Sequence, residues 1–178
     1  MQEIEVKILE INRDELEKKL LSLGAAKHFE GEMYAIFYDF KDGQIRRAGR
    51  VLRLRKEGDQ AVLTFKSPVS LKEAKIMDEF ESKIGNMDAM KHILSQIGLH
   101  PIKETRKFRT EYILDGCKVV IDHYQDALAY IPVFIEVEAP DLKSMKALVK
   151  KLGYSPEDCH SWSTYDLVKH YQAFSKTK

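Results

Sequence analysis

Two carboxylates and an ammonium group alternate with aliphatic residues near the N-terminus, in the sequence Glu3-Ile4-Glu5-Val6-Lys7. This period of two fits a β-strand, on which Glu3, Glu5 and Lys7 would share one face. Carboxylates are hard oxygen ligands for a divalent cation, and a lysine supplies a compact positive charge for an anion. The pattern therefore favours a site for a metal-bound polyphosphate, although the same alternation is also common on strands that simply face water.

The same spacing of charged residues recurs in apolar segments along the chain. The basic segments contain Arg53-Leu54-Arg55, Lys66 and Lys107-Phe108-Arg109, and the acidic segments contain Glu79-Phe80-Glu81, Asp122 and Glu136-Val137-Glu138. Because each segment mostly carries one sign of charge, we expect these strands to form a barrel with a polar lumen and an apolar outer wall. The alternative is a set of exposed strands joined by cross-strand ion pairs, which predicts mixed signs within each strand.

The basic residues predict a binding site for phosphate groups. Arg53, Arg55 and Lys66 would meet across a hairpin, where like charges repel by a few tenths of a kcal/mol or more per pair unless an anion lies between them. Guanidinium groups bind phosphate oxygens in a bidentate manner, and lysine adds a point charge. Lys107 and Arg109 repeat this arrangement on another strand.

The acidic residues predict a cation beside that anion. Glu136 and Glu138 end an otherwise apolar strand, and two carboxylates in such a place need positive partners. Such oxygen ligands suit Mg²⁺ or Mn²⁺ and suit zinc poorly. The full set of candidate ligands is Glu3, Glu5, Asp122, Glu136 and Glu138. Glu79 and Glu81 could line the same cavity, but we favour a role as counter-ions of the arginines.

Length and composition exclude several classes of protein. The 178 residues carry a formal net charge of +1, which argues against a nucleic-acid binder that relies on a basic surface. Two cysteines are too few for a disulfide framework or a zinc site. No apolar run approaches the roughly 20 residues that span a bilayer, and no signal peptide is recognisable. We therefore expect a cytoplasmic protein with one domain over residues 1–174 and a disordered tail over 175–178.

The elements that position these residues are predicted by capping and turn signals. Amphipathic helices are expected over 12–23, 86–97 and 141–152, each beginning at a capping Asn or Asp and ended by the glycine that follows it. A fourth helix is expected over 164–173. Two hairpins are expected, over 51–66 with a turn at 57–59 and over 106–123 with a turn at Asp115-Gly116. A further strand is expected over 33–40, and with the remaining segments we predict eight strands in total.

As an ordered set, these motifs resemble the CYTH family, also called the triphosphate tunnel metalloenzymes, which includes class IV adenylyl cyclases, thiamine triphosphatases and inorganic triphosphatases. The resemblance covers nearly the whole chain and also includes Tyr38-Asp39 and the segment Ser163-Thr164-Tyr165-Asp166-Leu167. It implies an α+β fold in which an eight-stranded antiparallel β-barrel forms a tunnel with helices packed outside. It further implies a triphosphate-bearing substrate and a divalent metal, Mg²⁺ or Mn²⁺.

The resemblance also implies a role for each candidate residue. The metal-side positions would be taken by Glu3, Glu5, Asp122, Glu136 and Glu138. The triphosphate-binding positions would be taken by Lys7, Arg53, Arg55, Lys66, Lys107 and Arg109, and the catalytic positions by Lys7, Glu136 and Glu138. One position departs from the family: Met77 stands where an arginine is common, so Lys75 or Lys83 would have to replace that phosphate contact.

The segment after Lys7 lacks the Phe-Leu-Val run common in inorganic triphosphatases, which favours the branch similar to class IV adenylyl cyclases. That branch implies conversion of ATP to cAMP and pyrophosphate by attack of the ribose 3′-hydroxyl on the α-phosphorus. The alternative is a triphosphatase that hydrolyses inorganic, thiamine or nucleoside triphosphate. A second alternative is a non-catalytic protein that binds nucleotide or polyphosphate. We expect the binding partner to be a small-molecule triphosphate, and we expect no binding to nucleic acid or to a membrane. The sequence leaves open whether the chain forms a homodimer.

Overall fold

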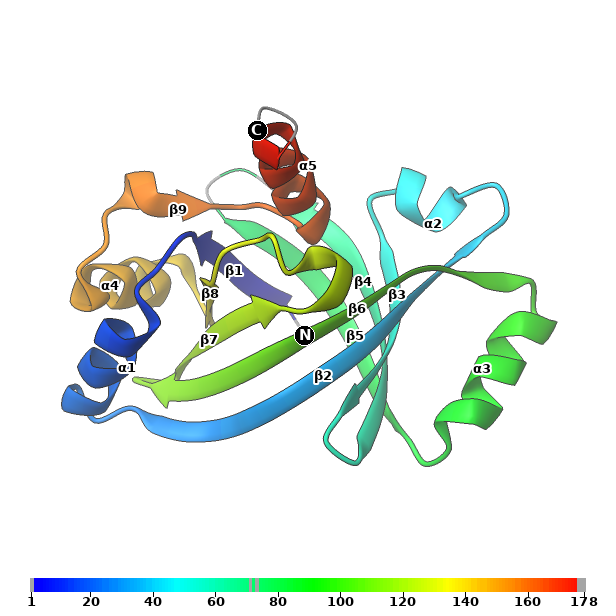
Figure 1. Ribbon diagram of the computed structural model, residues 1–178, viewed down its shortest axis with the longest axis horizontal. Helices are drawn as coiled ribbons and strands as arrows, with labels where there is room; N and C mark the ends of the chain where they lie inside the picture. Colours follow the sequence, from blue (N-terminus) through cyan, green and yellow to red (C-terminus); the bar gives the residue numbers. More distant parts are fainter. Residues whose placement is uncertain (1, 71, 73, 176–178) are drawn as a thin grey trace.

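An antiparallel β-sheet that closes on itself forms the centre of the computed structural model, which describes residues 2–70, 72 and 74–175 (Figure 1). The strands are β1 (Gln2–Ile8), β2 (Ala26–Phe40), β3 (Val51–Glu57), β4 (Gln60–Ser70), β5 (Lys75–Ile84), β6 (Leu99–Leu114), β7 (Cys117–Tyr124), β8 (Phe134–Ala139) and β9 (Cys159–His160). Their order is β5-β4-β3-β2-β6-β7-β8-β1-β9, and an additional pairing between β1 and β5 closes the first eight into a barrel. The predicted eight-stranded antiparallel barrel is confirmed.

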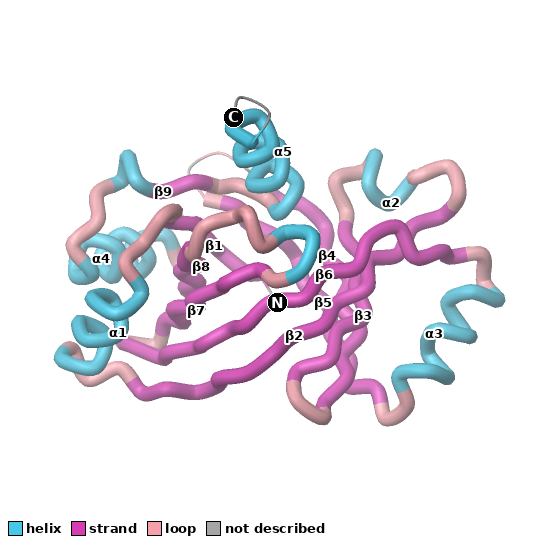
Figure 2. The backbone as a smooth tube through the Cα atoms, viewed as in Figure 1, coloured by secondary structure: helices cyan, strands magenta, loops and turns pink. Residues whose placement is uncertain are grey.

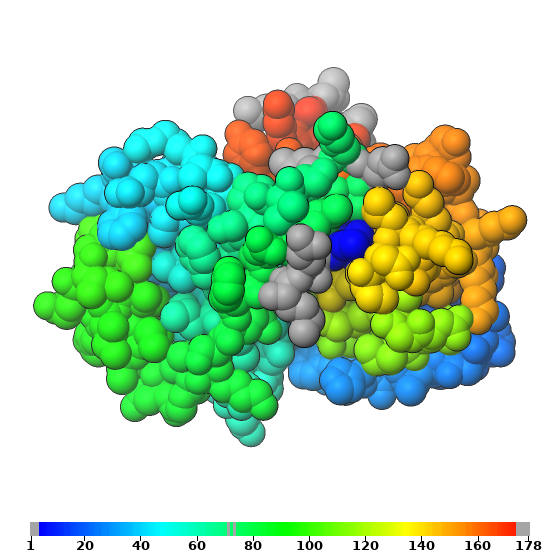
Figure 3. Space-filling model, turned by 180° about the vertical axis from the view of Figure 1, so that it is seen from behind, coloured from blue at the N-terminus to red at the C-terminus, as the bar shows by residue number. Residues whose placement is uncertain are grey.

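Strand β1 closes the barrel because it pairs with three other strands. Along one edge it pairs with β8 over residues 4–8. Along the other edge it pairs with β5 over residues 2–5 and then with β9 at residues 7 and 8. Seen from behind, β1 (blue) lies between β5 (green) and β8 (yellow), as this pairing requires (Figure 3).

Helices lie outside the barrel (Figure 2). The α-helices of the described residues are α1 (Arg13–Ser22), α2 (Gln44–Arg47), α3 (Met87–Gln96), α4 (Leu142–Leu152) and α5 (Thr164–Ser175). Two short 3₁₀ helices are η1 (Asp126–Leu128) and η2 (Pro156–Asp158). Helices α1 and α4 lie together at one end of the molecule and α3 lies at the opposite end. None of the described helices is long and apolar enough to cross a membrane.

The outer face of the barrel wall is apolar, as the alternation predicted. Val6, Val119 and Val137, from β1, β7 and β8, are fully buried in a core that also contains Leu20 of α1 and Leu148 of α4. A smaller core lies under α3, around Ile36, Leu54, Leu94 and Leu99. A third core joins Leu167 and Tyr171 of α5 to Tyr124, Ile131 and Phe134. The helices thus cover apolar surface that the strands cannot bury against each other.

The predicted helix signals are present in the structure. The side chains of the three predicted caps accept backbone N–H groups three residues later, at 3.3 Å for Asn12, 2.9 Å for Asn86 and 2.8 Å for Asp141. Gly153 ends α4 with φ +91°, a conformation that side chains with a Cβ rarely adopt. The β6–β7 turn has positive φ at both Asp115 and Gly116, which confirms the predicted hairpin.

Three features differ from the predicted elements. Strands β2 and β6 begin earlier than predicted, at Ala26 and Leu99, and pair along nearly their whole length. The short strand β9 and helix α2 were not predicted. Helix α2 is held by a distant cap, because the buried carboxylate of Asp39 accepts the backbone N–H groups of Ile45 at 2.9 Å and Arg46 at 3.0 Å. Of the predicted disordered tail, residue 175 ends α5 and residues 176–178 lie outside the described residues.

Candidate active site

Strand register places the candidate residues on the inner face of the barrel. Glu5 and Lys7 of β1 lie directly opposite Glu138 and Glu136 of β8. Arg109 of β6 likewise lies opposite Asp122 of β7. Directly opposite residues of an antiparallel pair point to the same side of a sheet. The register therefore brings charged residues from separate parts of the sequence together inside the barrel.

A cavity of about 1570 Å³ runs through this interior, from the β6–β7 turn to helix α2. The candidate residues on its wall are Glu5, Lys7, Arg53, Arg55, Lys66, Arg109, Glu136 and Glu138. Lys75, Met77, Glu79 and Glu81 line it as well. Asp122 and Lys107 are not on the cavity wall, and the side chain of Glu3 lies outside the described residues. The structure thus brings together most of the candidates, but not the whole set.

Five charged residues of β1, β6, β7 and β8, of which the first three line the cavity, form what we call the buried wall: Lys7, Arg109, Glu136, Lys107 and Asp122. The Lys7 ammonium, whose side chain is 2% exposed, donates to the Glu5 carboxylate and to Glu136 Oε1 at 2.6 Å. Arg109 binds Asp122 through two hydrogen bonds of 2.8 and 2.6 Å and also donates to Glu136 at 2.9 Å. Lys107 donates to the same Asp122. Lys7, Arg109, Asp122 and Glu136 are therefore each held by more than one partner.

These contacts change the proton affinities of the buried wall. Burial would lower the pKa of Lys7, but the carboxylates of Glu136 and Glu5 outweigh it and raise that pKa above its ordinary value. Burial and the Arg109 charge lower the pKa of Lys107 to about 8, although Asp122 acts in the opposite direction. Burial would raise the pKa of Glu136, but Lys7, Lys107 and Arg109 bring it well below its ordinary value. At neutral pH, Lys7 is thus protonated and Glu136 is ionised.

Five residues on the opposite side form what we call the open wall: Arg53, Arg55, Lys66, Glu79 and Glu81. Arg55 contacts Glu81 at 3.1 Å and also Glu57 at 2.9 Å, and Lys66 contacts Glu79 at 2.8 Å. Strand β5 therefore supplies carboxylates beside the grouped cations. The predicted repulsion among the cations is offset by these carboxylates, so it does not by itself require an anion. Glu79 and Glu81 occupy the counter-ion positions that we favoured.

One candidate, Asp122, has surroundings that differ from those expected of an open ligand. Asp122 is fully buried and its oxygens accept hydrogen bonds from Arg109 and Lys107, so it orients those two cations.

Met77, which stands where the family commonly has an arginine, is 3% exposed and faces the cavity without a charge. Of its two possible replacements, Lys75 lines the cavity and contacts Glu5 at 3.1 Å, whereas Lys83 is exposed. Lys75 is therefore the one positioned to replace the missing arginine.

The carboxylates on the cavity wall fit a divalent cation. Glu5 and Glu138 face each other across β1 and β8, and each now has a lysine partner, Lys75 at 3.1 Å for Glu5 and Lys118 at 2.8 Å for Glu138. Glu136 lies two residues before Glu138 on the same face. Among the described residues, no three His, Cys, Asp or Glu side chains gather closely enough to hold a metal alone. Mg²⁺ commonly takes one or two carboxylates and completes its coordination with substrate phosphates and water, so this donor set fits it.

The sequence reasoning missed several residues of the cavity wall, including Phe37, Arg46, Arg50 and Lys103. Lys103 belongs to β6, which we expected to begin only at Arg106. The signal was present, because Lys103 and Thr105 continue the alternation that runs on through Lys107 and Arg109.

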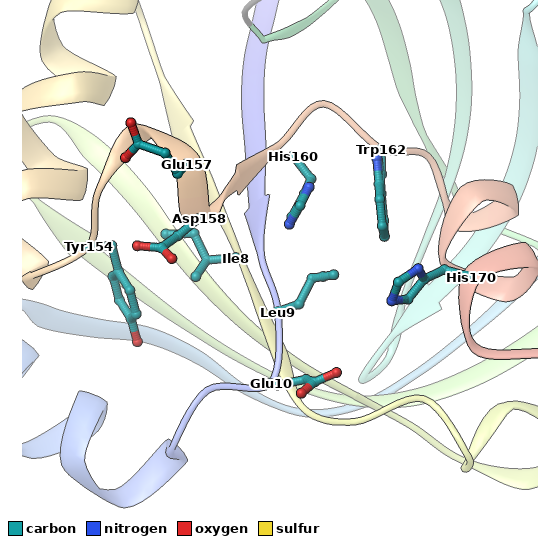
Figure 4. Close-up of a pocket in the computed structure, with 9 residues that line it drawn as sticks. All are labelled: Ile8, Leu9, Glu10, Tyr154, Glu157, Asp158, His160, Trp162 and His170. Carbon is teal, nitrogen blue, oxygen red and sulfur yellow. The ribbon is translucent and has the colours of Figure 1, made fainter. Parts of the chain in front are cut away.

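A second, smaller cavity of about 330 Å³ lies outside the barrel between β1, β9 and α5 (Figure 4). None of the candidate residues whose side chains the structure describes lines it. Trp162 packs on the rings of His160 and His170, with centroids 4.4 and 4.9 Å away. The acidic group Glu10 accepts a hydrogen bond from Tyr171 at 2.9 Å, and Asp158 caps η2. These contacts join β9 to α5, and α5 to the segment that follows β1.

Comparisons with known proteins agree with this geometry. The family model of the CYTH domain matches residues 1–159. A protein of Methanocaldococcus jannaschii, named as a candidate adenylate cyclase, is 26% identical over 141 residues, which are 78% of this chain and 77% of that protein.

Solved structures share the fold at lower identity. The PH1012 protein of Pyrococcus horikoshii has a TM-score of 0.77 at 20% identity, covering 93% of this chain and 98% of its own. A candidate adenylate cyclase of Vibrio parahaemolyticus has a TM-score of 0.79 at 18% identity, covering 94% and 97%. A Hippeastrum protein, described as a candidate adenylyl cyclase with a dominant triphosphatase activity, has a TM-score of 0.67 at 16% identity, covering 95% of each chain. Because the CYTH model matches most of the sequence, this chain belongs to the CYTH domain family.

Proposed function

We propose that this protein is a metal-dependent enzyme that acts on a triphosphate-bearing substrate inside the barrel, and that it converts ATP to cAMP and pyrophosphate. One observation carries the proposal: the cations Arg53, Arg55 and Lys66 and the facing carboxylates Glu5 and Glu138 line the same cavity of about 1570 Å³. A triphosphate needs the cations, and its divalent metal needs the carboxylates.

In this proposal, Arg53, Arg55 and Lys66 of the open wall hold the triphosphate. The contact of Arg55 with Glu81 is partly exposed, and such an ion pair contributes only about 0–1 kcal/mol. Phosphate oxygens carry more charge and accept bidentate guanidinium contacts, so they can replace this carboxylate. Arg109 would contact the substrate from a fixed position, because Asp122 holds its guanidinium in place.

Glu5, Glu136 and Glu138 would hold the Mg²⁺ or Mn²⁺ ion, and Lys7, Glu136 and Glu138 remain the proposed catalytic residues. A divalent metal, when bound there, supplies charge stabilisation and lowers the pKa of an attacking hydroxyl group. Lys7 has a raised pKa because it lies between Glu136 and Glu5. It therefore keeps its proton, and it contributes as a positive charge rather than as a base.

The size of the cavity favours a cyclase over an inorganic triphosphatase. Pockets for drug-sized ligands typically have volumes of about 300–1,000 Å³, so a bare triphosphate would leave much of this cavity empty. The names of the relatives from Methanocaldococcus jannaschii and Vibrio parahaemolyticus support the same choice. A triphosphatase is the second candidate, because the description of the Hippeastrum neighbour reports triphosphatase activity as dominant.

A product assay tests the proposal directly. The full chain would be incubated with ATP, thiamine triphosphate or tripolyphosphate, in Mg²⁺ and in Mn²⁺, and the products identified by chromatography. We expect cAMP and pyrophosphate from ATP. Release of orthophosphate alone would favour the triphosphatase, and tight binding with no product would favour a non-catalytic binding protein.

A further inference from the structure

Strand β6 contains a β-bulge where it passes the cavity. Phe37 of β2 pairs with Lys103, but the next residue, Tyr38, pairs with Pro101, which leaves Ile102 as one extra residue in β6. Bulges bend a strand and change the direction of nearby side chains, and they are frequent beside active sites. Both Phe37 and Lys103 line the cavity. The bulge therefore marks a place where the strand departs from regular pairing beside the candidate active site.

Lys103 differs from the other lysines of the cavity in its surroundings. Lys7 and Lys66 each contact a carboxylate. Within the described residues, Lys103 makes no ion pair or side-chain hydrogen bond, and burial alone lowers its pKa. A half-buried ammonium without a negative partner is unfavourable unless a ligand supplies an acceptor. This lysine therefore indicates a ligand contact that the barrel itself does not satisfy.

Phe37 lies between this lysine and the open wall. It is directly opposite Arg53 on β3 and directly opposite Lys103 on β6. Neighbouring strands are about 4.8 Å apart, so the backbones of Arg53 and Lys103 are about 10 Å apart. A substrate whose phosphates bind Arg53 would thus carry its organic part past the ring of Phe37 and toward Lys103.

The side chains of Phe37 and Lys103 indicate which kind of organic group the substrate carries. A phenyl ring offers a flat apolar surface, and base stacking on aromatic side chains contributes about 1–3 kcal/mol per base. An ammonium group adds a hydrogen-bond donor that needs an uncharged or negative acceptor. An inorganic triphosphate would leave Phe37 uncovered, and a positively charged ring, such as the thiazolium of thiamine, would be repelled by Lys103.

We propose that Phe37 and Lys103 form a specificity subsite for an uncharged nitrogen heterocycle, so that the barrel prefers a nucleoside triphosphate to an inorganic one. This inference rests on the proposed triphosphate site and adds the residues that recognise the remainder of the substrate. The two side chains contact the base, and the phosphates stay with the open wall.

Isothermal titration calorimetry on the full chain, with Mg²⁺ present, tests the subsite. The two probes are a non-hydrolysable ATP analogue and tripolyphosphate. We expect Lys103→Ala and Phe37→Leu each to weaken binding of the ATP analogue at least fivefold, while tripolyphosphate binding changes less than twofold. Lys56→Ala is the matched control, because Lys56 is an exposed lysine in β3 and its change should alter neither affinity.

The outcomes separate the subsite from the proposed function. Equal losses for both probes would make Lys103 a phosphate contact and overturn the subsite, as would unchanged affinity in both variants. A wild-type chain that binds tripolyphosphate but not the ATP analogue would overturn the subsite and leave the triphosphate site standing. A wild-type chain that binds neither probe would overturn both. Circular dichroism would establish that each variant is folded.

Discussion

The two walls of the barrel interior contain the same kinds of charged pair in different surroundings. On the buried wall, the side chains of Arg109 and Asp122 are 6% and 0% exposed. On the open wall, those of Arg55 and Glu81 are 14% and 38% exposed. The Arg109 contacts form part of a network that includes Glu136, Lys7 and Lys107, whereas Arg55 contacts its carboxylates on the wall of the cavity.

This difference in burial gives the two walls different energetic roles. Removing one partner of a buried pair costs about 3–5 kcal/mol, because it leaves the other charge without compensation. Breaking a partly exposed pair costs about 0–1 kcal/mol, because water solvates both groups. The buried wall therefore acts as a framework that fixes Arg109 and Lys7. The open wall can exchange its carboxylate partners for a ligand, so the same chemistry serves stability on one side and binding on the other.

The largest expected effect is on the free energy of unfolding, and its absence would contradict the difference between the buried wall and the open wall. Arg109→Ala should lower the free energy of unfolding by about 3–5 kcal/mol, because Asp122 and Glu136 lose a buried partner. Urea denaturation measures this. Arg106→Ala is the matched control on the same strand, since Arg106 is 55% exposed and its loss should cost about 0.5 kcal/mol or less. Equal effects of the two substitutions would mean that burial does not distinguish the walls.

The second effect is on turnover and concerns Glu138, a proposed ligand of the metal. Glu138→Gln should lower turnover at least about 30-fold, roughly 2 kcal/mol, because a ligand charge for the cation is lost. Its stability should change by less than about 1 kcal/mol, since the Lys118 contact of Glu138 is partly exposed. The product assay and urea denaturation measure these two quantities. Undiminished turnover of the wild-type chain in excess EDTA would contradict the assignment of a metal.

The third effect sharpens the description of the open wall. Arg55→Ala should weaken binding of tripolyphosphate at least tenfold, about 1.4 kcal/mol, while the unfolding free energy falls by no more than about 1 kcal/mol. Tripolyphosphate should raise the melting temperature of the wild-type chain and raise that of the variant much less. A thermal-shift series with Mg²⁺ measures both. If the ligand stabilises both proteins equally, the anion binds elsewhere.

The smallest effect is a pH dependence specific to the buried wall. The pKa of Glu136 is depressed in the folded chain, so its contribution to stability is complete above about pH 4.5 and is lost as the pH falls toward the folded value. In that acid range, the difference in unfolding free energy between wild type and Glu136→Gln should shrink by roughly 1 kcal/mol per pH unit. Urea titrations at several pH values measure it. A constant difference would show that Glu136 titrates normally.

Much of the fold could be predicted because local signals agree with tertiary packing. The strands were indicated by alternation of charged and apolar residues, the helices by Asn12, Asn86 and Asp141, and a hairpin by Asp115-Gly116. Helix α2 has no such signal, because its cap is a buried aspartate on the preceding strand and not a neighbouring residue. The early part of β6 was missed because Pro101 argues against a strand, and here the bulge at Ile102 accommodates it.

The sequence predicted which residues belong to the candidate site better than it predicted which of them contact each other. Period-two spacing identified residues that share the inner face, such as Arg55 and Glu138. It could not distinguish Arg109, buried and bound to Asp122, from Arg55, half open to the cavity, because burial depends on which strands become neighbours. For the same reason the spacing could not show that Asp122, which stays a predicted metal ligand, also anchors Arg109; the register between β6 and β7 shows this.

The three-way pairing of β1 has a consequence for the order of folding. Its partners are distant in sequence, since Glu5 contacts a residue 70 positions away and Lys7 one 129 positions away. Contacts of such separation form slowly, because long loops must close first. We therefore expect the pairings of β1 with β5 and with β8 to be the last part of the barrel to assemble and the first to open. Native-state hydrogen exchange should find the amides of these two pairings less protected than those between β6 and β7, and equal protection would contradict an opening confined to β1.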